Sequence, residues 1–239
     1  MALEIFDASL TAEQQVSIKH CGPAAIRMIL SRFGSLVSQN TLWTEVKNKS
    51  AGGTKVPANG SLVLEFPRQV CHDCGEWFCW FTTPEAMART IAGRVPSWLT
   101  AWAAYPATQD AALVWLIRSL ARAPRFPAAA TIFSSNHWVV ISGYHINNPK
   151  LPSVPIGPYA VNGIHVMDPF DDVPTATMMT VEDWNDCIKS LDCGPQKDAY
   201  PIVVGGLKTG IVYSWMRLMP RAWRLGDTWR RPRPNRNPL

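Results

Sequence analysis

The sequence predicts an α+β fold in which a helical first half packs against an antiparallel sheet formed by the second half. Helical spacing of apolar residues dominates up to about residue 123, whereas short β-branched runs bounded by Pro, Asn and Gly dominate afterwards. The chain has 239 residues, of which 47% are hydrophobic and 17% charged, enough for a large buried core. Because helices precede strands instead of alternating with them, we expect two layers with a cleft where they meet.

The first half contains four predicted helices. Each has apolar residues at helical spacing, a start or stop signal, or both. The expected ranges are Cys21 to Phe33, Asn40 or Thr41 to Val46, Thr83 to Gly93, and Gln109 to Ala123. Gly34 is placed to end the first helix. We expect these side chains to belong to the helical core: Trp98, Trp102, Leu113, Trp115, Leu116, Ile117 and Leu120.

The second half is predicted to be mostly strand, since its apolar runs are short and rich in β-branched residues. The expected strands are Ala128 to Phe133, Trp138 to His145, Ile164 to Met167, and Ile202 to Leu207. One helix interrupts them, because Thr180 and Asp183 form a capping-box pattern. Its apolar side repeats at helical spacing through Trp184, Cys187, Ile188 and Leu191. Residues 147–163 contain four prolines and are expected to form a surface loop.

We expect residues 1–225 to form one domain, with a helical lobe over about 11–123 and a β lobe over about 126–215. Residues 226–239 are rich in Arg and Pro, and we expect them to be disordered. The formal net charge of +5 is concentrated near this end, since residues 217–239 contain seven Arg and one Asp. A domain that follows a phosphate backbone would spread its charge more widely. The basic tail, with tryptophans among its arginines, is suited only to a weak anionic partner.

The location of the protein is predicted from what its sequence lacks. The first ten residues include Glu4 and Asp7 and have no basic region followed by an apolar one, as a secretion signal would. No run reaches the roughly 18 apolar residues of a membrane-spanning helix. We therefore expect a cytoplasmic protein without a membrane span, whose six cysteines remain free thiols. The oligomeric state is left open.

Cys21 is the candidate nucleophile because it opens the first predicted helix. It lies in the segment Gln15-Val-Ser-Ile-Lys-His-Cys21-Gly-Pro-Ala-Ala25. A thiol becomes a strong nucleophile when ionised, and a helix N-terminus favours the thiolate through its dipole and free N–H groups. Pro23 is tolerated in a first turn, and Gly22 is expected to let a substrate backbone approach. The alternative is a buried cysteine that merely begins a core helix.

His137 and Asp168 are the candidate base and its orienting acid. His137 begins the run His-Trp-Val-Val-Ile-Ser-Gly-Tyr, and at the rim of the β lobe it can reach a thiol in the other lobe and take its proton. Asp168 ends its strand on the same face as Ile164 and Val166. If the two strands pair, Asp168 is placed to orient the imidazole. The alternatives are a structural histidine and an ordinary Asp-Pro turn.

Gln15 is the candidate donor to an oxyanion. It lies six residues before Cys21, and its side-chain amide could act together with the Cys21 backbone N–H on a tetrahedral intermediate. Gln14 is adjacent and remains an alternative, although the six-residue spacing favours Gln15.

The order of these motifs resembles the papain-like superfamily of cysteine peptidases. The pattern Gln-x5-Cys-Gly-Pro-Ala, then His-Trp-Val-Val-Ile-Ser-Gly-Tyr, then Val-Met-Asp-Pro, is most similar to the bacteriocin-leader processing peptidases and their stand-alone relatives. The resemblance covers roughly 40 residues and matches the family's active-site positions at Gln15, Cys21, His137 and Asp168. It implies a papain-like fold, a peptide or protein substrate, a thioester acyl-enzyme, and hydrolysis without cofactor or metal. Where the family usually has an acidic residue before the nucleophile, this chain has His20.

Several alternatives remain open. His20 could be the base instead of His137. Cys71, Cys74 and Cys79, completed by Cys187 or Cys193, could hold a structural zinc, although packed free thiols fit their aromatic surroundings better. The same triad also serves acyltransferases, deamidases and isopeptidases, and a papain-like scaffold can act only as a binding module.

Overall fold

The computed structural model of the chain describes residues 3–7, 9–50, 69–70, 77–78, 82–121, 124–132, 137–146, 161–172, 175–190 and 198–208. The basic tail, the long proline-containing segment up to residue 160, and Cys71, Cys74, Cys79 and Cys193 lie outside these residues. The elements follow one another as β1 (Leu3–Phe6), α1 (Cys21–Ser31), α2 (Gln39–Ser50), β2 (Gln69–Val70), β3 (Trp77–Phe78), α3 (Pro84–Ala92), β4 (Leu99–Ala104), α4 (Gln109–Ala121), β5 (Ala128–Ile132), β6 (His137–Ile146), β7 (Val161–Met167), β8 (Ala176–Thr180), α5 (Val181–Cys187) and β9 (Ile202–Leu207).

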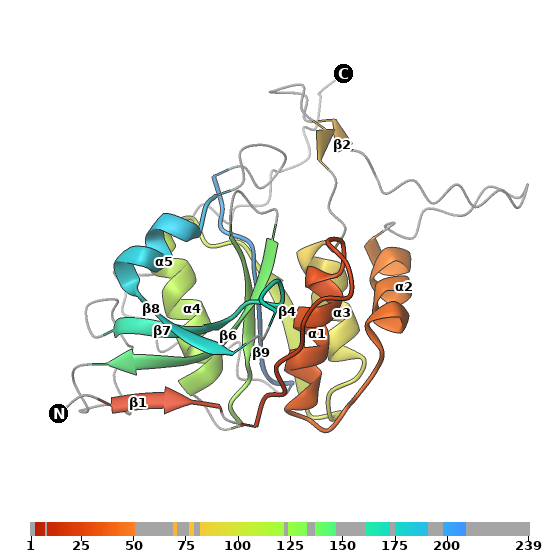
Figure 1. Cartoon of the computed structure of the whole chain (residues 1–239), viewed down its shortest axis with the longest axis horizontal. Helices are drawn as coiled ribbons and strands as arrows, with labels where there is room; N and C mark the ends of the chain where they lie inside the picture. The colour runs from red at the N-terminus through yellow and green to blue at the C-terminus, as the bar shows by residue number, and fades with distance from the viewer. Residues whose placement is uncertain are drawn as a thin grey trace, which may run out of the picture.

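An antiparallel sheet forms the centre of the molecule (Figure 1). Within the described part of the chain it has seven strands in the order β4-β9-β5-β6-β7-β8, with β1 paired to the second half of β6. All of its described pairings are antiparallel. The strands β2 and β3 pair separately. The predicted α+β class, with an antiparallel sheet, is confirmed.

The two faces of the sheet bury different helices. Helices α1 and α3 cover one face, where they pack on alternate strand residues such as Ala129, Val140 and Val203, and α2 packs on the outer side of these two helices. Helices α4 and α5 cover the other face, on neighbouring residues such as Val139 and Val204. Successive side chains of a strand point to opposite faces of the sheet, so each central strand contributes to the hydrophobic core on both faces. Helix α1 is the central helix of its layer, because it contacts α2, α3 and β6.

Local signals in the sequence explain where most helices begin and end. The Thr83 hydroxyl caps α3 by accepting a hydrogen bond from the Ala86 N–H, and Thr180 with Asp183 forms the predicted capping box of α5. Gly34 follows α1 with a φ of +72°, a left-handed conformation that glycine adopts without strain. Helix α2 begins earlier than predicted, because the Ser38 hydroxyl accepts a hydrogen bond from the Thr41 N–H.

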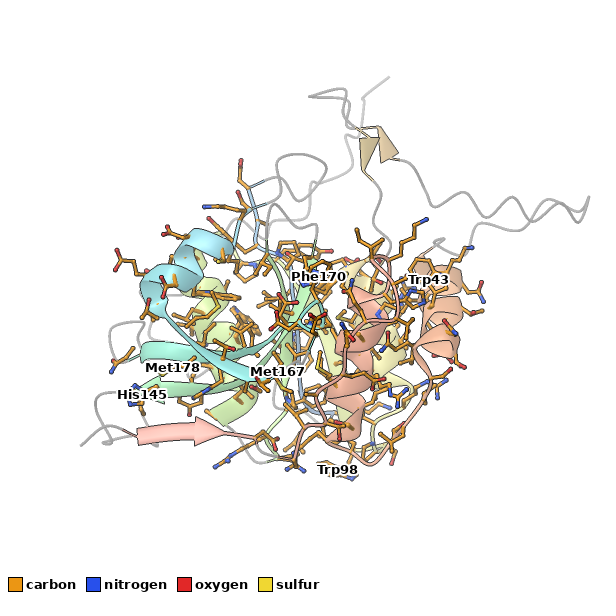
Figure 2. All side chains as sticks on the ribbon, in the orientation of Figure 1. Trp43, Trp98, His145, Met167, Phe170 and Met178 are labelled. Atoms are coloured by element: carbon orange, nitrogen blue, oxygen red, sulfur yellow. The ribbon has the colours of Figure 1, made fainter. Side chains whose placement is uncertain are left out.

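Five of the described strands were not predicted: β1, β2, β3, β4 and β8. β4 lies in the half of the chain predicted to be helical, where it pairs with β9 along its full length. The expected helical core is accordingly corrected at two tryptophans: Trp102 is part of β4, and Trp98 is 50% exposed at the edge of the molecule (Figure 2). In the described part of α4, the four predicted inward residues Leu113, Leu116, Ile117 and Leu120 are buried.

No helix within the described residues is both long and apolar enough to cross a bilayer.

Candidate active site

Cys21 is the first residue of α1, as predicted. The Ala24 N–H donates to the carbonyl of the N-cap residue His20, and Pro23 has no N–H to leave unsatisfied. The N–H groups of Cys21 and Gly22 therefore have no helical partner and point out of the helix N-terminus. The thiol is 8% exposed, and α1 has no acidic residue in its first turn to oppose a negative charge there.

Gly22 is required by packing, a constraint that the sequence alone did not show. A Cβ at this position would lie 2.2 Å from the Thr82 hydroxyl oxygen and 2.5 Å from the Thr82 Cβ. Thr82 is itself 2% exposed, and its carbonyl accepts a hydrogen bond of 3.0 Å from the Trp138 indole N–H. Thr82 thus lies between α1 and Trp138, the strand residue next to His137.

We expect Gly22→Ala to destabilise the protein by about 1–3 kcal/mol, the usual cost of overpacking a tight core position. The measurement is the free energy of unfolding in urea. The matched control is Gly93→Ala, because the Cβ added there would lie 3.4 Å from its nearest neighbour, the Arg89 carbonyl. That variant should change stability by no more than about 0.5 kcal/mol. Equal stabilities of the two variants would contradict the packing role of Gly22.

His137 lies at the start of β6, at the end of the sheet that faces the start of α1. Its neighbour Trp138 is 3% exposed and anchored to Thr82, which fixes the direction of the strand at this point. The imidazole Nε2 is 2.5 Å from the Asp168 Oδ1. The side chain of His137 is also hydrogen-bonded with that of Cys21. Because Nε2 is engaged by Asp168, the nitrogen left for Cys21 is Nδ1.

Asp168 follows β7, and the pairing of β6 with β7 brings it beside His137. In that register Val140 lies opposite Met167, so the two strand ends reach the same edge of the sheet. The Oδ1 atom that contacts His137 also accepts a hydrogen bond of 2.8 Å from the Phe170 N–H. The Phe170 ring packs edge-on against the imidazole with centroids 6.2 Å apart, at the boundary between the sheet and α1 (Figure 2).

The electrostatics of the site favour a protonated imidazole. Burial alone would lower the pKa of His137, but hydrogen bonds and negative charge from Asp168 and Cys21 outweigh it and raise the pKa to about 9. Burial alone would also raise the pKa of Asp168, but the bonds from His137 and the Phe170 N–H hold it below its usual value. At neutral pH the imidazolium therefore lies between two groups that stabilise its charge.

The raised pKa of His137 also links stability to pH. Protonated His137 stabilises the folded state fully below its unfolded pKa of about 6.5, and this contribution is lost as the pH rises through about 9. The lowered pKa of Asp168 contributes stability above its unfolded value of about 3.8, which is lost as the pH falls further.

We expect an NMR titration of His137 to give a pKa near 9 in the wild type and a clearly lower pKa in Cys21→Ser. The serine hydroxyl can still form a hydrogen bond but stays neutral, so the variant removes the negative charge that Cys21 contributes to the raised value. His145 lies at the other end of β6 and serves as an internal reference whose signal should not change between the two proteins. An unchanged His137 titration in Cys21→Ser would show that the imidazole does not pair with the thiol.

Gln15 lies in the segment that leads into α1, as predicted. Its backbone N–H donates to the Pro169 carbonyl at 2.8 Å, which ties this segment to the turn after Asp168. Its carboxamide oxygen is buried without a hydrogen-bond partner among the described residues. The neighbouring Gln14 has an exposed side chain that donates to the Asp172 carboxylate at 3.2 Å. The two neighbouring glutamines therefore differ in their contacts, because the Gln14 side chain is engaged by Asp172 and that of Gln15 is partly buried.

His20 makes its described contacts with Trp43 and Ser17 and not with Cys21. Its ring stacks on Trp43 of α2 with centroids 5.0 Å apart, and its Nδ1 is 2.6 Å from the Ser17 hydroxyl. This geometry favours His137 over His20 as the base. No cluster suited to a metal is present among the residues that the structure describes.

Three residues around this site were missed by the sequence analysis. Thr82 bonds to Trp138, which is 56 residues later in the chain, and Gln39 bonds to Val16, which is 23 residues earlier. Neither Thr82 nor Gln39 lies in a sequence motif. Phe170 follows the Asp-Pro pair of the third motif, and its position two residues after Asp168 was a signal that could have identified it.

Three solved structures are among those similar to this chain. One is a double-glycine motif protease from an AMS/PCAT transporter in complex with its leader peptide, with 12% identity over 86% of this chain and 99% of that one, at a TM-score of 0.41. Another is the peptidase domain of Streptococcus ComA, with 13% identity over 83% and 99%, at 0.43. The third is a C39-like peptidase from Bacillus anthracis, with 13% identity over 86% and 100%, at 0.49.

A search of curated proteins gives no match. A family model described as "Peptidase_C39 like family" matches residues 9–190, a range that contains Gln15, Cys21, His137 and Asp168. This match agrees with the papain-like arrangement predicted from the sequence, in which a helix opened by a cysteine packs on an antiparallel sheet. Because the model spans well over half of its length, the chain belongs to the Peptidase_C39 like family.

Proposed function

We propose that this protein is a cysteine peptidase that hydrolyses peptide bonds through Cys21 and a thioester acyl-enzyme. The observation that carries the proposal is the position of His137. Its imidazole bonds to the Asp168 carboxylate through Nε2 and to the Cys21 side chain, and its pKa is raised to about 9. This is the arrangement that holds a thiolate–imidazolium pair ready at neutral pH.

In the acylation step, the Cys21 thiolate attacks the carbonyl carbon of the substrate peptide bond. The carbonyl π electrons move to oxygen and form a tetrahedral oxyanion. His137 then transfers its proton to the leaving amine as the C–N bond breaks, which leaves a thioester on Cys21 and a neutral imidazole. Asp168 keeps the imidazole in the orientation that directs Nδ1 at the reaction.

In the deacylation step, the neutral His137 takes a proton from water, and the resulting hydroxide attacks the thioester carbon. Collapse of the second oxyanion breaks the C–S bond, restores the thiolate and releases the product as a carboxylic acid, which loses its proton to the solvent. The proton carried by His137 again balances the thiolate of Cys21, so the starting pair is restored.

The proposed oxyanion donors are the Cys21 backbone N–H and the Gln15 side-chain amide. The first lies at the N-terminus of α1, where N–H groups have no helical partner. For Gln15, the carboxamide oxygen is buried without a partner among the described residues, and we assign the amide nitrogen as the donor. We expect Gln15→Ala to lower kcat by about 10²–10³-fold with little change in KM, as measured by steady-state kinetics. Gln14→Ala is the matched control and should be mild.

The test of the proposal is intact-mass detection of an acyl-enzyme together with site-resolved alkylation. Wild-type protein mixed with a peptide library and quenched in acid should gain the mass of an acyl fragment, mapped to Cys21. Limited iodoacetamide at pH 6 should label Cys21 before Cys187, although Cys187 is the more exposed thiol. Burial and the charges of Asp186 and Asp183 raise the pKa of Cys187, so it is a suitable internal control.

The outcomes of this test separate the other functions. Acyl-enzyme that is released faster by added amines than by water would indicate an acyltransferase. Release of ammonia from glutamine side chains would indicate a deamidase, and cleavage at lysine side chains an isopeptidase. Peptide binding without any thioester, or alkylation of Cys187 ahead of Cys21, would overturn the proposal and indicate a binding module.

A further inference from the structure

Gln39 is a buried glutamine that contacts the segment carrying Gln15. It is the first residue of α2 and is 2% exposed. Its Oε1 accepts a hydrogen bond of 3.0 Å from the Val16 N–H, and its Nε2 donates to the Gln14 carbonyl at 2.7 Å. These two groups belong to the peptide units on either side of Gln15. The Gln39 carboxamide therefore binds the backbone around Gln15 much as a neighbouring strand would.

The remaining bonds complete the restraint on Gln15. Its own N–H donates to the Pro169 carbonyl on the opposite side. Three of the four polar groups in the two peptide units that flank Gln15 are thus fixed, which restricts both of its backbone dihedral angles. The direction in which its side chain leaves the backbone is fixed with them.

The same glutamine is connected to the nucleophile helix. Its Nε2 also contacts the Glu13 carboxylate at 3.2 Å, and the other Glu13 oxygen pairs with Arg27 of α1 at 2.5 Å. Gln39 therefore links the segment before Cys21 to the helix that begins with Cys21. Only a carboxamide can accept from Val16 while donating to Gln14 and Glu13, and an asparagine side chain is shorter by one methylene.

We propose that Gln39 is a positioning residue that holds the Gln15 amide in place as an oxyanion donor. The inference rests on the proposed peptidase function, because only a reaction that develops an oxyanion needs this placement. Gln39 does not touch the substrate; it acts through Gln15 alone. The thiolate–imidazolium pair is formed by other residues and does not depend on it.

The experiment is a double-mutant cycle between Gln39→Met and Gln15→Ala. Methionine keeps the side-chain length and apolar bulk but has neither donor nor strong acceptor. We expect Gln39→Met to lower kcat by about 10–10²-fold with KM nearly unchanged, and to have almost no further effect in the Gln15→Ala background. Asn40→Met, an exposed neighbour on the same helix, is the matched control and should leave kcat unchanged.

Two readouts without turnover accompany the cycle. Alkylation of Cys21 by iodoacetamide forms no oxyanion, so Gln39→Met should leave its rate unchanged. Hydrogen exchange of the Val16 amide should accelerate at least tenfold in the variant, because its acceptor is lost. Gln39→Glu, which keeps the acceptor but loses both donors, serves if the methionine variant does not fold; it should show the same selective loss of kcat.

The results of these experiments distinguish a failure of the Gln39 inference from a failure of the peptidase proposal. Additive losses in the cycle, or equal losses in turnover and alkylation, would assign Gln39 a general structural role and overturn the inference. An unchanged kcat in Gln39→Met would overturn it as well. A wild-type protein that never forms an acyl-enzyme would overturn the peptidase proposal and with it the positioning role, even if the Val16 exchange responds as expected.

Discussion

Cys21→Ala is expected to lower turnover by at least about 10⁴-fold while leaving the protein folded. The covalent route requires the sulfur, so the variant can neither form the thioester nor pair with His137. The loss of one sulfur atom at a helix start removes little buried surface, and Cys21 is at the edge of its core cluster with 8% exposure. The measurements are peptide turnover and circular dichroism during urea unfolding.

Cys187→Ala is the matched control for this prediction. Cys187 is a second free thiol, on α5 at the other face of the sheet, and it is not part of the proposed chemistry. Turnover of Cys187→Ala should equal that of the wild type. Substantial turnover in Cys21→Ala would show that another group attacks the substrate.

His137→Ala is expected to lower kcat by about 10³–10⁴-fold, and Asp168→Asn by only about 10–10²-fold. Removing the imidazole removes both the proton donor and the partner of the thiolate. The asparagine can still orient the imidazole, because the Phe170 N–H requires a hydrogen-bond acceptor at the position of Oδ1. That N–H selects the rotamer in which the carboxamide oxygen faces His137, so Nε2 stays protonated and Nδ1 stays directed at Cys21.

The comparison of these two variants separates orientation from charge. The pKa of His137 should fall in Asp168→Asn, since the carboxylate charge is lost, and the alkaline limit of activity should move to lower pH. Steady-state kinetics as a function of pH measure both effects. Equal losses in the two variants would mean that Asp168 does more than orient the imidazole, or that folding depends on it.

Local signals in the sequence predict the helices well because their ends are determined by nearby residues. The Thr83 cap, the Thr180–Asp183 capping box and Gly34 all act within four residues of the helix that they bound. The strands that were missed lack such signals. β4 is Leu-Thr-Ala-Trp-Ala-Ala, a composition with little β propensity, and it is a strand because it pairs with β9, about a hundred residues later.

The candidate site also contains residues that local patterns predict and residues that depend on distant contacts. Cys21, His137 and Asp168 stand at a helix start and at strand ends, where the sequence marks chemistry through short motifs. Thr82 and Gln39 support those residues through contacts with distant backbone groups. Such contacts depend on how α2 and α3 pack against α1, which no local pattern encodes. The packing role of Gly22 was missed for the same reason, since Thr82 is sixty residues away.

The antiparallel pairing of β6 with β7 has a consequence for how this chain can vary in length. His137 and Asp168 are 31 residues apart, yet they meet because the two strands run in opposite directions. The connection between the strands leaves from Ile146 and returns at Val161, at the far end of the pair. Residues can therefore be gained, lost or exchanged for a foreign sequence between these points with the proposed triad held in register. Within the turn at Pro169, a single inserted residue would separate Asp168 from its Phe170 bond and Gln15 from its backbone partner.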